Sequence, residues 1–227
     1  ADFATGAELF DREWAFGAPM MRVACLAQIM IRHPTEADTL GPLLARSVDE
    51  LMAPEARAFS RSRWGSDPLT GDDVRHAHAA YLGYAGFSLG LAALAAPAFT
   101  AQRRHVGDRL RARVAAAPER WLETYPGEAY PVDVAAVVAA LALDEDGPAS
   151  AEREAALARV RSAVDPATGL LVQAIDPTTR AAAALRVECR VAPADVYPPP
   201  PQGAPSHAAS GETATEVPLL RCAFPDG

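Results

Sequence analysis

The stretch Met20–Ile31, MMRVACLAQIMI, decides the fold because it is apolar on nearly every side of an α-helix. A helix of this kind is buried in a protein core. The segment that follows, Glu36–Met52, has the same helical spacing but carries a charged face, which is typical of a helix at the surface. Only His33-Pro34-Thr35 joins the two, and short links make neighbouring helices antiparallel. The sequence therefore predicts a hairpin of one inner and one outer helix.

This pairing of an inner with an outer helix recurs twice along the chain. Apolar residues at helical spacing predict six helices, at Ala18–His33, Glu36–Met52, Asp73–Ala95, Phe99–Ala116, Val132–Leu143 and Ala151–Val164. Proline cannot continue a helix, and one follows each of the six, at Pro34, Pro54, Pro97, Pro118, Pro148 and Pro166. The predicted fold class is all-α, with three antiparallel helical hairpins.

Composition and charge exclude several classes of protein. The 227 residues include no lysine, which excludes Schiff-base chemistry, and a net charge of -8 with scattered acids argues against nucleic acid as a partner. The three cysteines have no CxxC spacing, so they signal neither a metal site nor a disulfide framework. Because no P-loop or dinucleotide fingerprint occurs, we expect no cofactor.

The chain changes character from Ala181 onward. Eight prolines fall between Pro193 and Pro225, and the run Pro198–Pro201 cannot be helical. We therefore predict a helical domain at 1–180, followed by a proline-rich, irregular or disordered tail at 181–227.

The apolar stretches in this chain are short. Two of them, Ala85–Ala96 and Val134–Leu143, fall below the roughly 20 residues that a membrane-spanning helix needs. We therefore expect no membrane span. Since the chain begins at Ala1, we expect a processed or trimmed product, and the sequence assigns no compartment.

The long connections that precede the inner helices hold most of the residues capable of chemistry, and loops on a rigid scaffold commonly carry function. The richest is WLETYPGEAYPVD, at 121–133. Its acids are predicted as catalytic residues and its phenols as groups that orient a substrate: Glu123, Glu128 and Asp133, with Tyr125 and Tyr130. Carboxyls in unlike environments can divide acid and base roles. The alternatives are a solvated loop for the glutamates and a purely structural role for Asp133 in the first turn of its helix.

Residues of the other connections are predicted to contact the substrate: Trp64, Asp67, His76, Tyr84, Gln173 and Asp176. The alternative for Trp64 is packing, and for His76 a hydrogen bond within the core. His76 and His78 are two residues apart on a predicted helix and so point about 200° away from each other. We therefore expect no shared metal ion.

The string ETYPGEAYPVD at 123–133, together with WGSD at 64–67, YLGY at 81–84 and GLLVQAID at 169–176, resembles a group of bacterial α/α-toroid proteins. These are distantly similar to the linalool dehydratase/isomerase domain and to glucuronyl C5-epimerase-like and six-hairpin glycosidase toroids. The resemblance covers roughly Leu9 to Asp176. It implies an (α/α)6-type toroid whose substrate cavity lies at the rim formed by the loops before the inner helices.

The resemblance also implies that this chain forms only part of a ring. Similar proteins continue into further hairpins, whereas this sequence turns to proline-rich residues after Asp176. An open arc leaves the apolar concave face uncovered, and large exposed apolar patches mark contacts with partners. We expect that face to be covered by a homodimer contact or by a companion segment.

Two functions follow from these observations. The first is an acid/base enzyme, whether lyase, isomerase or glycan-active, that acts on a hydroxylated small molecule or glycan at the rim. The second is a non-catalytic, truncated toroid that serves as an interaction or structural module.

Overall fold

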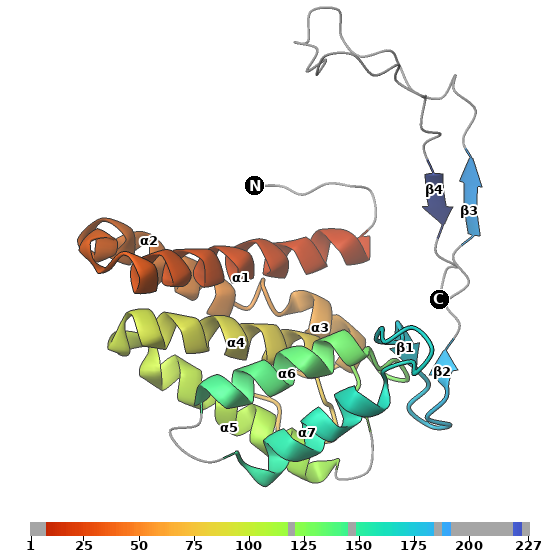
Figure 1. Cartoon of the computed structure of the whole chain (residues 1–227). Coiled ribbons are helices and arrows are strands. Elements are labelled where there is room, and N and C mark those ends of the chain that lie inside the picture. The colour runs from red at the N-terminus through yellow and green to blue at the C-terminus, as the bar shows by residue number, and fades with distance from the viewer. Residues whose placement is uncertain (1–7, 118–120, 145–148, 184–187, 192–219, 224–227) are drawn as a thin grey trace, which may run out of the picture. The chain divides into compact units, whose positions relative to one another are not determined.

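The structure is a computed structural model, and it describes residues 8–117, 121–144, 149–183, 188–191 and 220–223 (Figure 1). These residues contain seven α-helices and two short pairs of antiparallel strands. The chain divides into two units, Ala1–Ala183 and Ala184–Gly227, and all seven helices belong to the first. The predicted all-α class is confirmed.

The first hairpin consists of α1 (Glu8–Arg32) and α2 (Ala37–Met52), joined by the short 3-10 turn η1 (Pro34–Glu36). The inward side of α2 carries buried residues at helical spacing, Leu44, Val48 and Leu51. The prediction started the first helix at Ala18, whereas α1 begins earlier and contains Pro19 within it. A proline removes one backbone hydrogen bond from a helix, and it does not end this one.

The second and third hairpins follow the predicted order. α4 (Ala79–Ala95) leads through η2 (Pro97–Phe99) into α5 (Thr100–Ala116), and α6 (Pro131–Asp144) is followed by α7 (Ala151–Ser162). α4 packs against α1, α5 and α6, and it is the most buried of the helices. The three antiparallel hairpins are confirmed, and their arrangement as a sector of an α/α-toroid remains a prediction.

Glycines set the close approach of α4 to α6. A Cβ atom added at Gly83 would lie 3.0 Å from the backbone nitrogen of Val137 and 3.1 Å from the carbonyl oxygen of Asp133. At Gly90 it would lie 2.6 Å from the Cβ of Leu143. Larger residues at these positions would push the two helices apart.

The segment between the first two hairpins differs from the prediction. It contains α3 (Ala58–Trp64), a short helix that ends at Gly65 in the left-handed conformation. The second inner helix was predicted from Asp73 and instead starts at Ala79, because His78 adopts φ 49° and cannot belong to an α-helix. Residues 73–78 are therefore a loop.

Two strand pairs complete the described residues. β1 (Ala174–Ile175) pairs with β2 (Ala182–Ala183) in the helical unit, and Ile175 donates its backbone N–H to the carbonyl of Ala129 at 2.8 Å. In the second unit, β3 (Glu188–Val191) pairs with β4 (Leu220–Ala223). The rest of the predicted irregular tail, including its four consecutive prolines, lies outside the described residues.

One helix is long and apolar enough to cross a membrane, by length and composition alone. It is the Arg12–Arg32 part of α1, of which one third is buried against the rest of the unit. A core helix and a signal sequence near the N-terminus share these properties. The prediction of no membrane span rested on Ala85–Ala96 and Val134–Leu143 and did not consider this stretch.

We predict that Gly83→Ala lowers the free energy of unfolding by about 1–3 kcal/mol, because the new methyl group meets backbone atoms of α6 that cannot move aside. Gly41→Ala in α2 is the matched control, since nothing lies within 4 Å of its added Cβ. That substitution should raise the free energy of unfolding by up to about 1 kcal/mol. Urea denaturation of both variants measures the difference, and equal effects would contradict the close approach.

Candidate functional site

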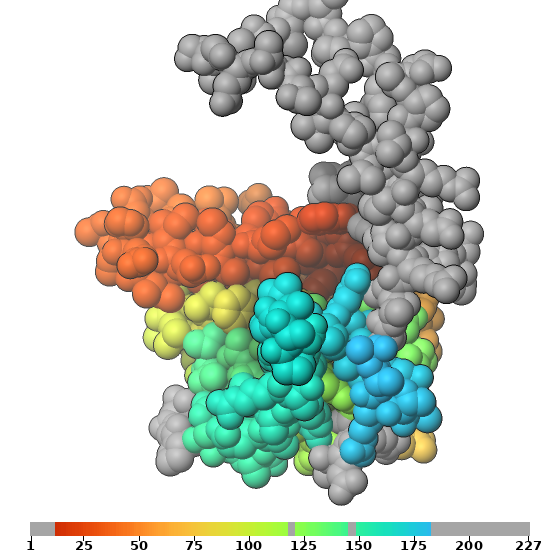
Figure 2. Space-filling model, turned by 45° about the vertical axis from the view of Figure 1, so that its right-hand side comes forward, coloured from red at the N-terminus to blue at the C-terminus, as the bar shows by residue number. Residues whose placement is uncertain are grey.

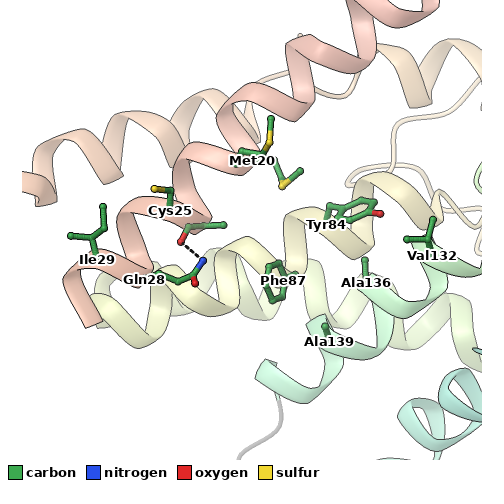
Figure 3. A pocket seen from close by; sticks show the side chains of 11 residues that line it. Met20, Cys25, Gln28, Ile29, Tyr84, Phe87, Val132, Ala136 and Ala139 are labelled. Carbon is green, nitrogen blue, oxygen red and sulfur yellow. Dashed lines mark hydrogen bonds between the residues drawn. The ribbon is translucent and has the colours of Figure 1, made fainter. Parts of the chain in front are cut away.

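An apolar groove of about 560 Å³ lies between α1 and α6, with α4 beneath it (Figure 3). Its lining comprises Met20, Met21, Ala24, Cys25, Gln28 and Ile29 of α1, Tyr84 and Phe87 of α4, and Val132, Ala136 and Ala139 of α6. Few of these side chains are polar, and Gln28 donates to the carbonyl of Ala24 at 3.1 Å. The groove exists because α1 and α6 both pack on α4 and both carry apolar residues on their remaining sides.

A buried carboxyl, that of Asp133, lies behind one end of this groove. Asp133 is in the first turn of α6 and is 8% exposed. It accepts hydrogen bonds from the hydroxyl of Thr124 and from that of Tyr84, which itself lines the groove. The side chain is therefore bonded to other side chains of the site, in addition to being near the helix N-terminus.

Burial controls the ionisation of this pair. Burial raises the pKa of Asp133, and the negative charge of Glu13 raises it further. The hydrogen bonds from Thr124 and Tyr84 lower it, but by less than burial raises it. Burial, together with the charge of Asp133, raises the pKa of Tyr84 to about 12. Both groups hold their protons more tightly than they would in water, so Asp133 is suited to donate a proton.

A second carboxyl and phenol pair lies next to the first. Tyr125 is 6% exposed and donates its hydroxyl hydrogen bond to Glu13 of α1. The guanidinium of Arg63 lies 4.8 Å from the centre of the Tyr125 ring, within the range of a cation–π contact. Burial and the hydrogen bond to Glu13 raise the pKa of Tyr125. This pair ties α1 and α3 to the 121–133 connection.

The third acid of this cluster, Glu128, is more accessible. Arg63 donates to one of its carboxylate oxygens at 2.6 Å, and the hydroxyl of Tyr130 donates to the other at 2.8 Å. Burial, followed by the hydrogen bond with Glu128, raises the pKa of Tyr130 to about 12. The charge of Asp133 also acts on Tyr130, so the two acids share one electrostatic neighbourhood.

Glu123, the remaining predicted catalytic acid, is directed elsewhere. Its carboxylate accepts a hydrogen bond from the backbone N–H of Gly127 at 2.8 Å, and its carbonyl accepts one from Ala79 at 3.1 Å. It lines a much smaller pocket beside Arg75, Arg113 and other residues of α5 and its flanks. Glu123 thus holds the turn that presents Glu128 and is bonded to neither Glu128 nor Asp133.

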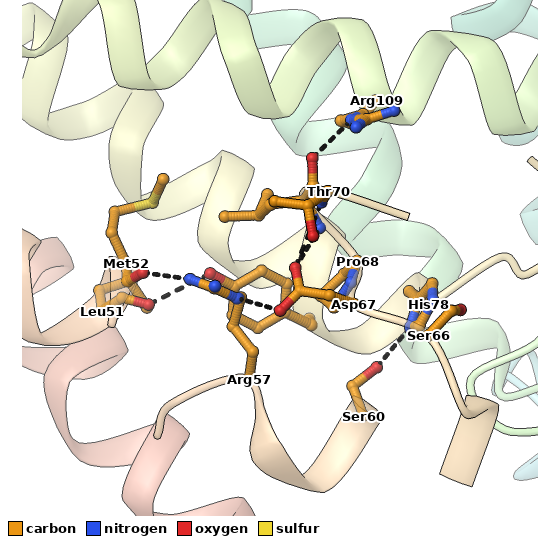
Figure 4. A network of polar contacts seen from close by, with 12 residues as sticks. Leu51, Met52, Arg57, Ser60, Ser66, Asp67, Pro68, Thr70, His78 and Arg109 are labelled. Carbon is orange, nitrogen blue, oxygen red and sulfur yellow. Dashed lines mark hydrogen bonds and ion pairs between the residues drawn. The ribbon is translucent and has the colours of Figure 1, made fainter. Parts of the chain in front are cut away.

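Asp67 and Trp64, both predicted to contact substrate, hold the loop before α4 (Figure 4). Asp67 pairs with Arg57 at 2.9 Å and accepts backbone N–H groups of Leu69 and Thr70. Burial opposes its ionisation, but these hydrogen bonds outweigh burial and its pKa is lowered. The indole of Trp64 donates to the carbonyl of Thr124 at 2.9 Å, which links α3 to the 121–133 connection.

Gln173 and Asp176 flank β1. Gln173 is exposed, and Asp176 caps a turn by accepting the backbone N–H groups of Thr178 and Thr179. These hydrogen bonds lower the pKa of Asp176. The two residues lie on either side of β1, whose Ile175 is hydrogen-bonded to Ala129, and neither of them lines the groove.

The geometric argument about His76 and His78 was wrong, because both residues precede α4 rather than forming part of it. Their ring centres are 6.3 Å apart in an edge arrangement, and both rings lie against Trp64. Among the residues that the structure describes, no group of three or more His, Cys, Asp or Glu side chains is placed to hold a metal ion.

The prediction did not select Glu13, Thr124 or Arg63 as site residues. The fold and the site together define an all-α protein with a cluster of acids and phenols at one end of an apolar groove. Comparison of the chain with protein-family models, with curated proteins and with solved structures finds no match. The resemblance to α/α-toroids therefore stays a prediction.

We predict that the free energy of unfolding of the wild-type protein falls as pH rises from about 4 to the folded pKa of Asp133, and that Asp133→Asn does not show this fall. The folded pKa of Asp133 lies above its ordinary value of 3.8, so between the two values the folded state binds more protons than the unfolded chain. The free energy of unfolding must then fall as pH rises. Urea denaturation of both proteins from pH 4 to pH 8 compares the slopes. Parallel curves would contradict a raised pKa.

Proposed function

We propose that this chain is an acid/base enzyme that acts on a hydroxylated, largely apolar small molecule bound in the groove of α1, α4 and α6. The observation that carries the proposal is the carboxyl of Asp133. Its pKa is raised, and it is hydrogen-bonded to Tyr84, which lines that groove. Perturbed carboxyls beside an apolar cavity mark candidate active sites.

The lining of the groove favours an apolar ligand over a glycan. Its volume of about 560 Å³ is within the usual range for small-molecule sites, roughly 300–1,000 Å³. A glycan presents hydroxyl groups along its whole length and needs many hydrogen-bond partners, since unpaired buried polar groups are costly. The groove offers polar side chains mainly at Tyr84 and Gln28, which suits a ligand with one hydroxyl group.

In the proposed reaction, the hydroxyl of Tyr84 turns from Asp133 and donates its proton to the hydroxyl oxygen of the substrate, and the protonated carboxyl of Asp133 replaces that proton. The carbon–oxygen bond then breaks and water leaves. A neighbouring carbon loses its proton to a carboxylate, for which Glu128, held by Arg63 and Tyr130, is the candidate base. Return of water at the same or another carbon would make the reaction an isomerisation.

A second function is favoured by the apolar residues exposed along α1. Met21 is 49% exposed, Ile31 is 42% exposed and Ile29 is 39% exposed. Figure 2 shows the first hairpin as a continuous band of surface along one side of the helical unit, next to α4. A second copy of the chain could cover this face, as expected for an interaction module. Light scattering distinguishes the enzyme from the interaction module. A molar mass that stays that of the monomer at all concentrations would contradict the second function.

We predict that Ala136→Phe weakens binding of the uncharged fluorescent probe N-phenyl-1-naphthylamine at least about tenfold, because the ring fills the groove from α6. Ala112→Phe, at an exposed position on α5, is the matched control and should leave affinity unchanged. Fluorescence titration measures both. Equal affinities for the two variants would show that the probe binds elsewhere.

We predict that Asp133→Asn lowers kcat/KM by about 10²- to 10⁴-fold on any apolar alcohol that the wild type converts, because the general acid is lost. Glu123→Gln should leave turnover unchanged, since that carboxylate is bonded to Gly127. Gas chromatography of reactions with a panel of branched and linear alcohols measures conversion. Full activity in Asp133→Asn, or loss in Glu123→Gln alone, would overturn the proposed assignment.

A further inference from the structure

A chain of hydroxyl and imidazole groups runs from Ser60 of α3 into the loop before α4, and Figure 4 shows three of its members, Ser60, Ser66 and His78. None of its members lines the groove. The hydroxyl of Ser60 is 2.7 Å from Nδ1 of His78, and Nε2 of the same ring is 3.3 Å from the hydroxyl of Ser66. That hydroxyl lies 2.6 Å from Nδ1 of His76. The chain therefore runs from Ser60 through His78 and Ser66 to His76.

The neutral state of His78 limits these hydrogen bonds to two directions, one for each tautomer of the ring. This ring is fully buried, and burial, with the nearby charges of Arg113 and His76, lowers its pKa to about 3, so it is neutral. A neutral ring accepts at one nitrogen and donates at the other. If Ser60 donates to Nδ1, then Nε2 donates to Ser66, and the proton of Ser66 is directed at His76.

Exposure singles out Ser66 as the reactive point of the chain. Ser60 is 1% exposed, whereas Ser66 and His76 are half-buried and reach solvent. The loop is held in place by Arg113, which is 1% exposed and donates to the carbonyls of His76 at 2.8 Å and of Pro68 at 3.1 Å. The serine and its imidazole partner are therefore fixed with respect to each other.

The far side of the His76 ring faces an acid. Its Nε2 is 3.8 Å from a carboxylate oxygen of Asp73, which also forms a two-point pair with Arg75. A hydroxyl bonded to a histidine is the pairing that activates a nucleophile, and here an acid faces the opposite side of that ring without a hydrogen bond to it. Here the serine bonds to Nδ1, and Nε2 faces the acid.

We infer that Ser66 is a nucleophile activated by His76 and that it takes acyl groups from small, uncharged esters. The oxygen of Ser66 attacks the ester carbonyl carbon while His76 accepts the serine proton. The bond to the alcohol breaks, and His76 returns the proton to the departing alcohol oxygen. Water then attacks the acyl carbonyl carbon while His76 takes its proton, the bond to the Ser66 oxygen breaks, and His76 returns the proton to that oxygen as the acid leaves. This activity is separate from the reaction proposed in the groove.

The test is covalent labelling of the full-length chain with a small alkyl fluorophosphonate. Its phosphorus bonds to the serine oxygen, the phosphorus–fluorine bond breaks, and fluoride leaves while His76 takes the proton. Intact mass spectrometry should show one adduct, and peptide mapping should place it on Ser66. Hydrolysis of p-nitrophenyl acetate should be lost in the labelled protein.

Ser62 provides the matched control. It is an exposed serine on α3 whose hydroxyl donates to the carbonyl of Phe59 at 2.8 Å, with no imidazole partner. Ser62→Ala should label at the wild-type rate, Ser66→Ala should not label, and His76→Gln should label at least about 100-fold more slowly. Circular dichroism confirms that each variant is folded.

The inference is overturned if the wild type takes up no label, if the label is found on Ser62 or other hydroxyls, or if His76→Gln labels at the wild-type rate. Should His76→Gln fail to fold, Asp73→Asn serves as the second variant, because the partly exposed carboxylate of Asp73 faces the His76 ring at 3.8 Å. Slower labelling of Ser66 in that variant supports the inference, and an unchanged rate counts against it.

Discussion

The close approach of α4 to α6 is the constraint on which the rest of the structure depends. Gly83 lets the backbone of α4 lie against Val137 and the carbonyl of Asp133. The next residue along α4, Tyr84, then reaches the carboxyl of Asp133 with its hydroxyl. A larger separation of the two helices would move the hydroxyl of Tyr84 away from that carboxyl. Helix packing and the acid site are thus parts of one arrangement.

The sequence predicted the helical hairpins because the signals for them are local. Apolar periodicity and prolines mark α2, α5, α6 and α7 within a few residues of their ends. The start of α4 depends on a distant contact: the N–H of Ala79 bonds to the carbonyl of Glu123, and His78 turns into the left-handed region before it. No pattern within residues 73–78 reports that contact, and so the loop was predicted as helix.

Within the candidate site, the sequence predicted the acids and phenols of the 121–133 connection but not their division of roles. Asp133 and Glu128 belong to one cluster, whereas the carboxylate of Glu123 accepts a hydrogen bond from Gly127 in its own turn. The spacing of these residues in the sequence does not determine the directions in which their side chains point. Glu13 reaches Tyr125 across 112 positions of sequence. The groove was missed for the same reason, because its lining comes from three helices.

Burial shifts the pKa in opposite directions at the two clusters, and at both it disfavours the charged form. Removal from water disfavours the charged form of any group, so it raises the pKa of Asp133 and lowers that of His78. The first becomes a proton donor behind the groove, and the second becomes a fixed link between two serine hydroxyls. Each of the two groups is linked toward solvent or ligand through one hydroxyl, that of Tyr84 for Asp133 and that of Ser66 for His78. A helical core with few aromatic residues thereby places two groups with reactive potential at separate points of the same scaffold.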